Sequence, residues 1–153
     1  MKIEIPRIVR RLDLGDYAGE MKEAHIFMWV NPPRAKRAEI YLISKRIDWV
    51  AEAAQLLSPT GPPPLAPQPD MEPNPFVGLS REELEAKALE IHAQLCAWWA
   101  EMWSQGEPEL RWTAEEVGEF FAGAVDTDPK LISFVRSGCL HLMAEHAERA
   151  QKN

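Results

Sequence analysis

The segment from Ser58 to Leu79 constrains this fold most, because the largest group of the chain's 13 prolines lies there. Proline removes a backbone amide donor and fixes the backbone, so the segment cannot form regular helix or sheet. We expect an extended connector, which could span roughly 60 Å at about 3.1 Å per residue. A connector is favoured over a proline-rich recognition ligand, which stays open as the alternative. The chain therefore divides into residues 1–57, a linker at 58–79 and residues 80–153.

Two amphipathic helices are predicted on either side of this linker. The first runs from about Pro33 to Leu57, with apolar residues at spacings of three and four: Ile40, Ile43, Ile47, Val50, Ala54 and Leu57. The second runs from about Arg81 to Ser104 and repeats the spacing with Leu84, Ala88, Ile91, Leu95, Trp98 and Met102. Ser80 and Glu83 form a capping box at its start.

Two shorter helical patterns follow. Thr113 and Glu116 form another capping box, and Asp128 followed by Pro129 is expected to cap the last helix, which ends near Arg149. Residues 80–153 then form three antiparallel helices, and the helix at 33–57 is available as a fourth.

The N-terminal residues favour a small antiparallel sheet. Ile3 and Ile5 alternate with polar residues and predict a short strand at 2–9, which Pro6 restricts to an edge. The large and β-branched residues at 25–30 predict the best strand. Such a sheet is marginal alone and must pack on a helix. The expected fold class is mainly α with a small N-terminal antiparallel β-hairpin or sheet (α+β), its two halves forming one domain.

Asn31, Pro32 and Pro33 mark the switch from this sheet to the first helix. An asparagine side chain can accept a hydrogen bond from a free amide of the first helical turn, so Asn31 is the predicted N-cap. Pro32 suits the first helical position, where its missing amide would have had no partner.

Charge and composition restrict the partners. The net charge is −7 over 153 residues, which argues against nucleic acid as the main partner. No signal sequence and no run long enough to cross a membrane are visible. Cys96 and Cys139 lie in apolar helical contexts and are expected to be free thiols. We therefore expect a cytoplasmic protein without a membrane partner.

The sequence offers little catalytic chemistry. Cys139, His141 and His146 are the nearest approach to a metal site. On a helix, however, the first two point about 200° apart and the last two about 140° apart. There is no phosphate-binding glycine loop and no nucleophile beside an evident base. We expect no catalytic residue, no metal and no cofactor, and hence no enzyme.

Tryptophan is the most unusual feature of the composition, with 6 in the chain. The sequence allows two interpretations of the cluster in the second half: a core beneath the N-terminal sheet, or a docking surface for another polypeptide. On the second interpretation the partner-binding residues are Leu95, Trp98, Trp99, Met102, Trp103 and Trp112. Self-association through the same face is a further alternative.

Several stretches resemble tail assembly chaperone-type proteins of long-tailed bacteriophages. They are Leu12–Ala18, Ile26–Val30 with Asn31–Pro33, Trp112–Val117, Asp128–Leu131 and Phe134–His146, which together cover about half of the chain. The proline-rich segment is not a required part of that pattern.

This resemblance implies a phage or prophage factor in the host cytoplasm. Such a factor binds the tape-measure protein, or another tail component, and keeps it soluble during virion assembly. In that group a longer form is often made by ribosomal frameshifting. The alternative is an adaptor or regulatory interaction module, for example a neutraliser of a toxin. A small hydrolase or metal enzyme is a third, weaker hypothesis.

Overall fold

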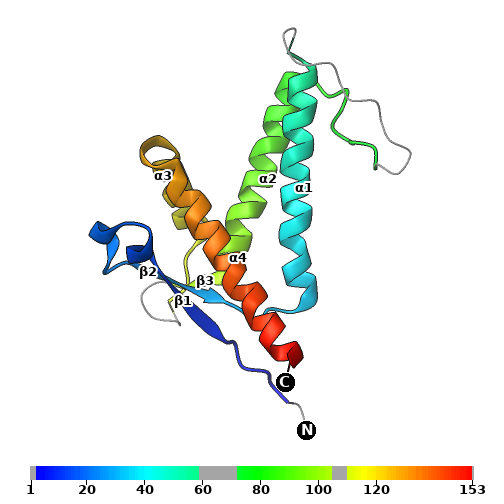
Figure 1. The fold of residues 1–153 in the computed structure, drawn as a ribbon. Coiled ribbons are helices and arrows are strands. Elements are labelled where there is room, and N and C mark those ends of the chain that lie inside the picture. Colours follow the sequence, from blue (N-terminus) through cyan, green and yellow to red (C-terminus); the bar gives the residue numbers. More distant parts are fainter. Residues whose placement is uncertain (1–2, 59–71, 105–109, 153) are drawn as a thin grey trace. The chain divides into compact units, whose positions relative to one another are not determined.

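The computed structural model describes residues 3–58, 72–104 and 110–152 (Figure 1). The described helices are α1 (Arg34–Leu56), α2 (Arg81–Met102), α3 (Ala114–Thr127) and α4 (Pro129–Lys152). The described strands are β1 (Val9–Asp13), β2 (His25–Trp29) and β3 (Trp103–Ser104), and two 3-10 turns, η1 (Leu14–Asp16) and η2 (Gly19–Met21), connect β1 to β2. With 67% helix and a small three-stranded antiparallel sheet, the predicted fold class is confirmed.

The helix starts follow the capping patterns in the sequence. The Ser80 hydroxyl accepts a hydrogen bond from the Glu83 amide at 3.2 Å, which satisfies a donor of the first turn of α2. Thr113 and Glu116 form the complete reciprocal box at the start of α3. The predicted capping box is confirmed at Thr113, whereas at Ser80 the structure shows the side-chain cap, with the Ser80 hydroxyl donating to the Glu83 carboxylate at 3.1 Å.

The chain folds as two compact units that are not consecutive in sequence. Unit 1 contains residues 1–37 and 96–153, and unit 2 contains residues 38–95. Helices α1 and α2 each run from one unit into the other. The division at 58–79 drawn from the sequence, with the two halves joined as one domain, stays a prediction.

In unit 1, the sheet has the order β1-β2-β3 with antiparallel neighbours. Strand β2 confirms the predicted strand at 25–30, and its register with β1 runs from Val9↔Trp29 to Asp13↔His25. The predicted strand at 2–9 is wrong in most of its length. Ile3 and Ile5 lie before the sheet, with 84% and 83% of their surface exposed.

Strand β3 replaces the last turn predicted for α2. The sequence favoured helix to Ser104, but α2 ends at Met102 and the next two residues pair with β2. Trp103 stands opposite Met28, and Ser104 stands opposite Phe27. Pairing with an existing strand satisfies backbone groups that would otherwise end the helix unpaired.

Asn31 connects three parts of unit 1, and its predicted N-cap role is wrong. Its Oδ1 accepts hydrogen bonds from the Ile8 amide at 2.7 Å and from the Trp29 indole N–H at 3.0 Å. Its Nδ2 donates to the Pro6 carbonyl at 2.9 Å. The first turn of α1 instead begins with the Arg37 amide donating to the Pro33 carbonyl at 3.1 Å. The paired register of β1 and β2 begins at Val9; the Ile8 carbonyl still accepts from the Val30 amide at 2.9 Å, but the Ile8 amide donates to a side chain.

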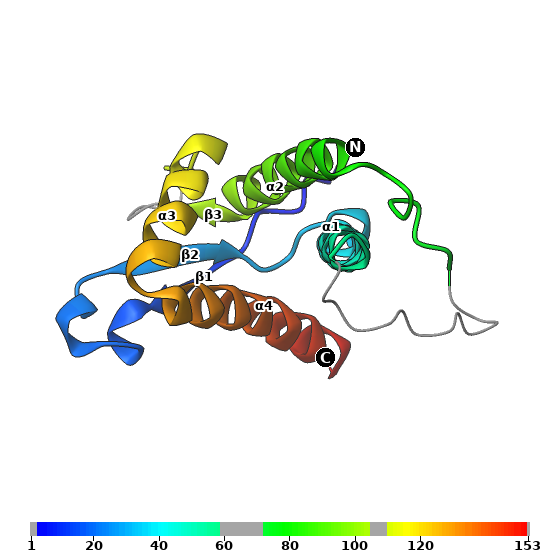
Figure 2. The same ribbon diagram turned by 90° about the horizontal axis from the view of Figure 1, so that it is seen from above.

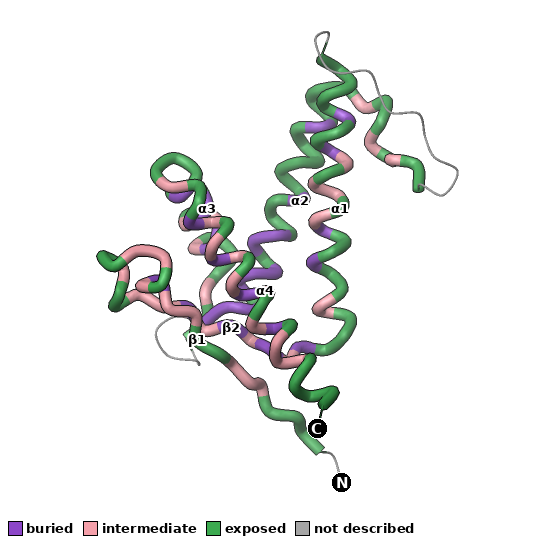
Figure 3. The backbone as a smooth tube through the Cα atoms, in the orientation of Figure 1, coloured by how far each residue is buried: buried purple, intermediate pink, exposed green. Residues whose placement is uncertain are grey.

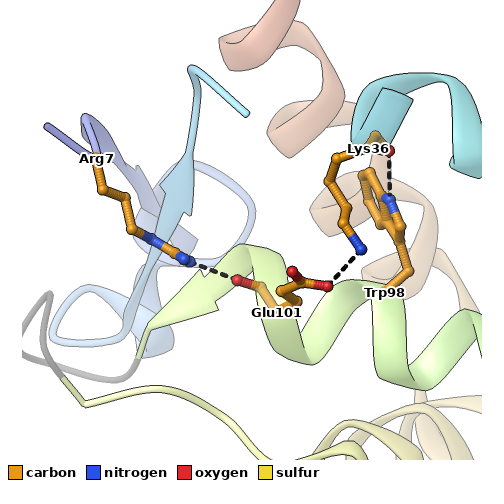
Figure 4. A network of polar contacts seen from close by, with 4 residues as sticks. All are labelled: Arg7, Lys36, Trp98 and Glu101. Carbon is orange, nitrogen blue, oxygen red and sulfur yellow. Dashed lines mark hydrogen bonds and ion pairs between the residues drawn. The ribbon is translucent and has the colours of Figure 1, made fainter. Parts of the chain in front are cut away.

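A second polar network joins the start of α1 to the end of α2 (Figure 4). Lys36 Nζ lies 2.6 Å from a carboxylate oxygen of Glu101, and the Trp98 indole N–H donates to the Lys36 carbonyl at 2.8 Å. The guanidinium of Arg7 donates to the Glu101 carbonyl. The segment before β1 is thereby attached to both helices.

Helix α4 covers one face of the sheet and lies along β1 and β2 (Figure 2). A Cβ placed on Gly138 of α4 would lie 2.8 Å from Leu12 Cδ1, so glycine allows the helix to approach β1 closely. Leu12 pairs with Ile26, which is 2% exposed. The face of the sheet that carries these two residues is therefore the core side.

A long-range hydrogen bond holds the corner between α3 and α4. Pro129 begins α4 as predicted, but the Asp128 carboxylate is not used as a cap among the described residues. Both of its oxygens accept from the Tyr17 hydroxyl, at 2.7 and 2.8 Å. The Tyr17 ring also packs on Phe134, with centroids 5.2 Å apart.

Unit 2 consists of the greater part of α1 and α2 together with residues 72–79. Its buried positions recur along both helices (Figure 3) and confirm most of the predicted stripes, but Ala54, Leu57 and Ala88 are exposed. Asn74 Nδ2 donates to the Trp49 carbonyl at 2.8 Å, and Phe76 packs edge-on to the Trp49 ring. The end of the predicted linker thus packs on α1, and the rest of it, residues 59–71, lies outside the described residues.

We expect Asn31→Ala to lower the free energy of unfolding by about 2–4 kcal/mol, because it leaves two donors and one acceptor without their partner. Asn31→Ser is the informative comparison. Serine is as good an N-cap as asparagine but is too short to make the three contacts. Asn31→Ser should therefore lower the free energy of unfolding nearly as much as Asn31→Ala. Urea unfolding followed by tryptophan fluorescence measures both values. An Asn31→Ser variant with the same free energy of unfolding as the wild type would contradict the bridging role.

We expect Tyr17 to make stability depend on pH in the alkaline range. The hydrogen bond to Asp128, with smaller effects of burial and of the same carboxylate's charge, raises the pKa of Tyr17 above its ordinary value of about 10. The stabilisation that this hydrogen bond provides is therefore complete below pH 10. It is lost as the pH rises through the pKa that Tyr17 has in the folded state. Tyr17→Phe should be less stable at neutral pH, and the difference from wild type should shrink in unfolding curves measured above pH 10.

Candidate functional site

The residues predicted to bind a partner lie in the interior. Trp99, Met102 and Trp103 are fully buried, Trp98 and Leu95 are 2% and 6% exposed, and Trp112 is half-buried. In unit 1, the Trp99 ring lies 4.9 Å from Trp98 and 4.8 Å from Trp103. These side chains form packing contacts in this structure, which is the first of the two interpretations of the tryptophan cluster. An exposed docking surface has to be sought elsewhere.

Both cysteines are buried, and neither forms a disulfide bond. Burial raises the pKa of the Cys139 thiol to about 12, although the nearby Trp103 indole opposes this shift. Burial also raises the pKa of Cys96. Both sulfurs are therefore protonated at neutral pH, and a thiolate nucleophile is not provided at either position.

The histidines of α4 do not form a metal-binding set with their neighbours. His141 Nε2 lies 4.0 Å from a carboxylate oxygen of Glu145. His146 lines a hollow together with Glu145 and two arginines, Arg10 and Arg149. In the part of the chain that the structure describes, no three His, Cys, Asp or Glu side chains are grouped as a metal site would require.

Unit 2 contains an open apolar hollow of about 300 Å³ where α1 ends and α2 begins. Its floor is apolar, and Arg81 and Glu85 stand at its edge. We call it the hairpin groove, and its lining residues are Val50, Ala54, Leu57, Arg81, Leu84, Glu85 and Ala88.

The groove follows from two small residues in the packing stripes. Ala54 of α1 and Ala88 of α2 each stand in a predicted stripe between larger apolar residues, and both are exposed. The fold places both in the lining of the same hollow. A methyl group leaves space where the neighbouring stripe residues carry branched side chains. The sequence predicted the two stripes. It could not predict that Ala54 and Ala88 line the same hollow, because that depends on how the two helices are aligned.

The chain matches no known protein family, no curated protein and no solved structure. None of the described helices combines the length and the apolar character that crossing a bilayer requires. Function therefore has to be inferred from the geometry of the chain's own residues.

We expect Trp99→Ala to lower the free energy of unfolding by about 3–5 kcal/mol, since it opens a cavity in a fully packed cluster. Val125→Ala serves as the control, because Val125 lies on α3 of the same unit with 61% of its surface exposed and should change stability by less than about 0.5 kcal/mol. Thermal and urea unfolding followed by far-UV circular dichroism measure both. Equal stability of the two variants would count against a core role for Trp99.

Proposed function

We propose that this protein is a non-enzymatic tail assembly chaperone of a bacteriophage or prophage, which binds the tape-measure protein or another tail component in the host cytoplasm. The observation that carries the proposal is the hairpin groove, an apolar surface that an unassembled polypeptide could occupy. The resemblance of several sequence stretches to that group supports the same function.

The groove has the chemistry of a site for a helical segment. An amphipathic helix binds by placing apolar side chains, spaced by three and four residues, in a groove between helices. Val50 and Leu84 provide an apolar floor, and Leu57 at the edge is 42% exposed. Arg81 and Glu85 carry opposite charges at the rim, where they could orient a bound helix.

The stretches that carry the family resemblance and the hairpin groove lie in different units of the chain. All the resembling stretches, between Leu12 and Pro33 and between Trp112 and His146, lie in unit 1. The groove lies in unit 2, between those stretches in sequence. We therefore assign the common architecture to unit 1 and the recognition of this protein's own partner to unit 2.

Co-expression with the tape-measure protein of the same genome tests the proposal. We expect a larger soluble fraction of the tape-measure protein and a complex that co-purifies. Ala88→Arg should weaken that complex by at least about tenfold, because it places a long charged side chain in the apolar groove.

Ala86→Arg is the matched control. Ala86 is also exposed on α2 but points about 200° away from Ala88 around the helix. Circular dichroism of both variants establishes that they fold. The function is overturned if the wild-type chain neither solubilises nor binds the tail protein. The groove alone is overturned if Ala88→Arg and Ala86→Arg bind equally well.

A further inference from the structure

The sheet of unit 1 has a second face that α4 does not cover. Side chains alternate along a strand, so the residues next to Ile26 and Met28 on β2 point to the opposite side. On that side His25, Phe27 and Trp29 are half-buried, whereas Ile26 and Met28 are 2% and 0% exposed. We call this side the open sheet face.

The pairing register places two arginines on one row across this face. Arg11 of β1 stands opposite Phe27 of β2, and Phe27 stands opposite Ser104 of β3. Ser104 in turn pairs with Arg111 through an isolated bridge. The row therefore has an aromatic ring near its middle and a guanidinium group at each end.

A third arginine belongs to the neighbouring row. The guanidinium carbon of Arg7 lies 4.1 Å from the centre of the Trp29 ring. Its Nε is buried and has no hydrogen-bond partner among the described residues. Burial lowers the pKa of Arg7, the nearby positive charge of Arg111 lowers it further, and Glu101 opposes both. Two like charges lie close together here, and an added anion would relieve their repulsion.

Among the described residues, carboxylates neutralise only one of these three arginines. Asp13 forms an ion pair with Arg11 at 2.9 Å, and the Glu101 carboxylate pairs with Lys36. Arg111 forms no ion pair with any residue that the structure describes. Within the part of the chain that the structure describes, Arg7 and Arg111 thus keep their positive charge without a paired carboxylate, in a chain whose net charge is −7.

We propose that the open sheet face binds an acidic, extended segment of a partner polypeptide. A carboxylate of that segment would bind at Arg7 and Arg111, and its apolar side chains would lie on Phe27 and Trp29. Guanidinium groups bind carboxylates in a planar, two-pronged geometry. Arginine beside aromatic rings is the composition that dominates binding at protein interfaces.

The charges favour an acidic peptide over a nucleic acid or a second copy of this chain as the occupant of the open sheet face. A nucleic acid needs several phosphates to be neutralised at once, and the strong negative charge of the whole chain opposes that. A second copy paired through the edge of β1 about Arg11 would set the two Arg11 side chains against each other. The surface belongs to unit 1 and does not depend on the function proposed for the hairpin groove.

Fluorescence anisotropy with a labelled peptide in which glutamate alternates with valine tests the inference on the full chain. We expect binding that weakens as salt is added. Arg111→Glu should weaken it by at least about tenfold. Arg10→Glu is the matched control, because Arg10 is an exposed neighbour of Arg11 on the same strand but faces α4, and it should leave binding within about twofold.

Further measurements separate the alternatives. The same peptide with lysine in place of glutamate should not bind. Ala88→Arg, which blocks the hairpin groove, should bind the acidic peptide like wild type, so failure of one proposal is distinguishable from failure of the other. The inference is overturned by absent binding of the acidic peptide or by equal effects of Arg111→Glu and Arg10→Glu. It is also overturned by tighter binding of a single-stranded oligonucleotide of the same length, or by self-association that Arg111→Glu abolishes.

Discussion

The hydrogen bonds of the Asn31 side chain fix the organisation of unit 1. Two five-residue strands form a marginal ladder by themselves. One carboxamide joins the segment before β1 to the end of β2 and to the indole of Trp29, which extends the ladder beyond its last backbone pair. The same contacts hold the segment that carries Arg7. The edge of the sheet and the position of Arg7 on the open sheet face are therefore both tied to this one side chain.

The tryptophans show how a composition that suggests an interface can form a core. A sheet of three short strands buries one face only if large side chains fill the space beneath it. Trp99 and Trp103 provide that volume at the end of α2, and Met28 packs there from β2 with no exposed surface. Because α4 covers the sheet on the core side alone, the aromatics of β2 that point the other way stay half-exposed.

The two proposed surfaces differ in physical character. The hairpin groove is apolar and exists because two alanines leave a volume between helices. The open sheet face carries arginines around aromatic rings and exists because the helices cover one side of the sheet. One surface belongs to unit 2 and the other to unit 1, so each can be altered by substitution without touching the other.

The sequence by itself determined what depends on neighbours a few residues apart: the four helices, the side-chain cap at Ser80, the capping box at Thr113, and the strand at 25–30. Tertiary structure decided the rest, because the partners are remote. Asn31 bonds residues 23 and 25 positions away, and Tyr17 reaches Asp128 across 111. Asn31, a residue type that favours helix N-caps, therefore forms hydrogen bonds between remote segments instead. Trp103 and Ser104, at the end of a helical sequence pattern, form strand β3. Helix periodicity identified the stripes with Ala54 and Ala88, but only the alignment of the two helices brought these alanines to one hollow.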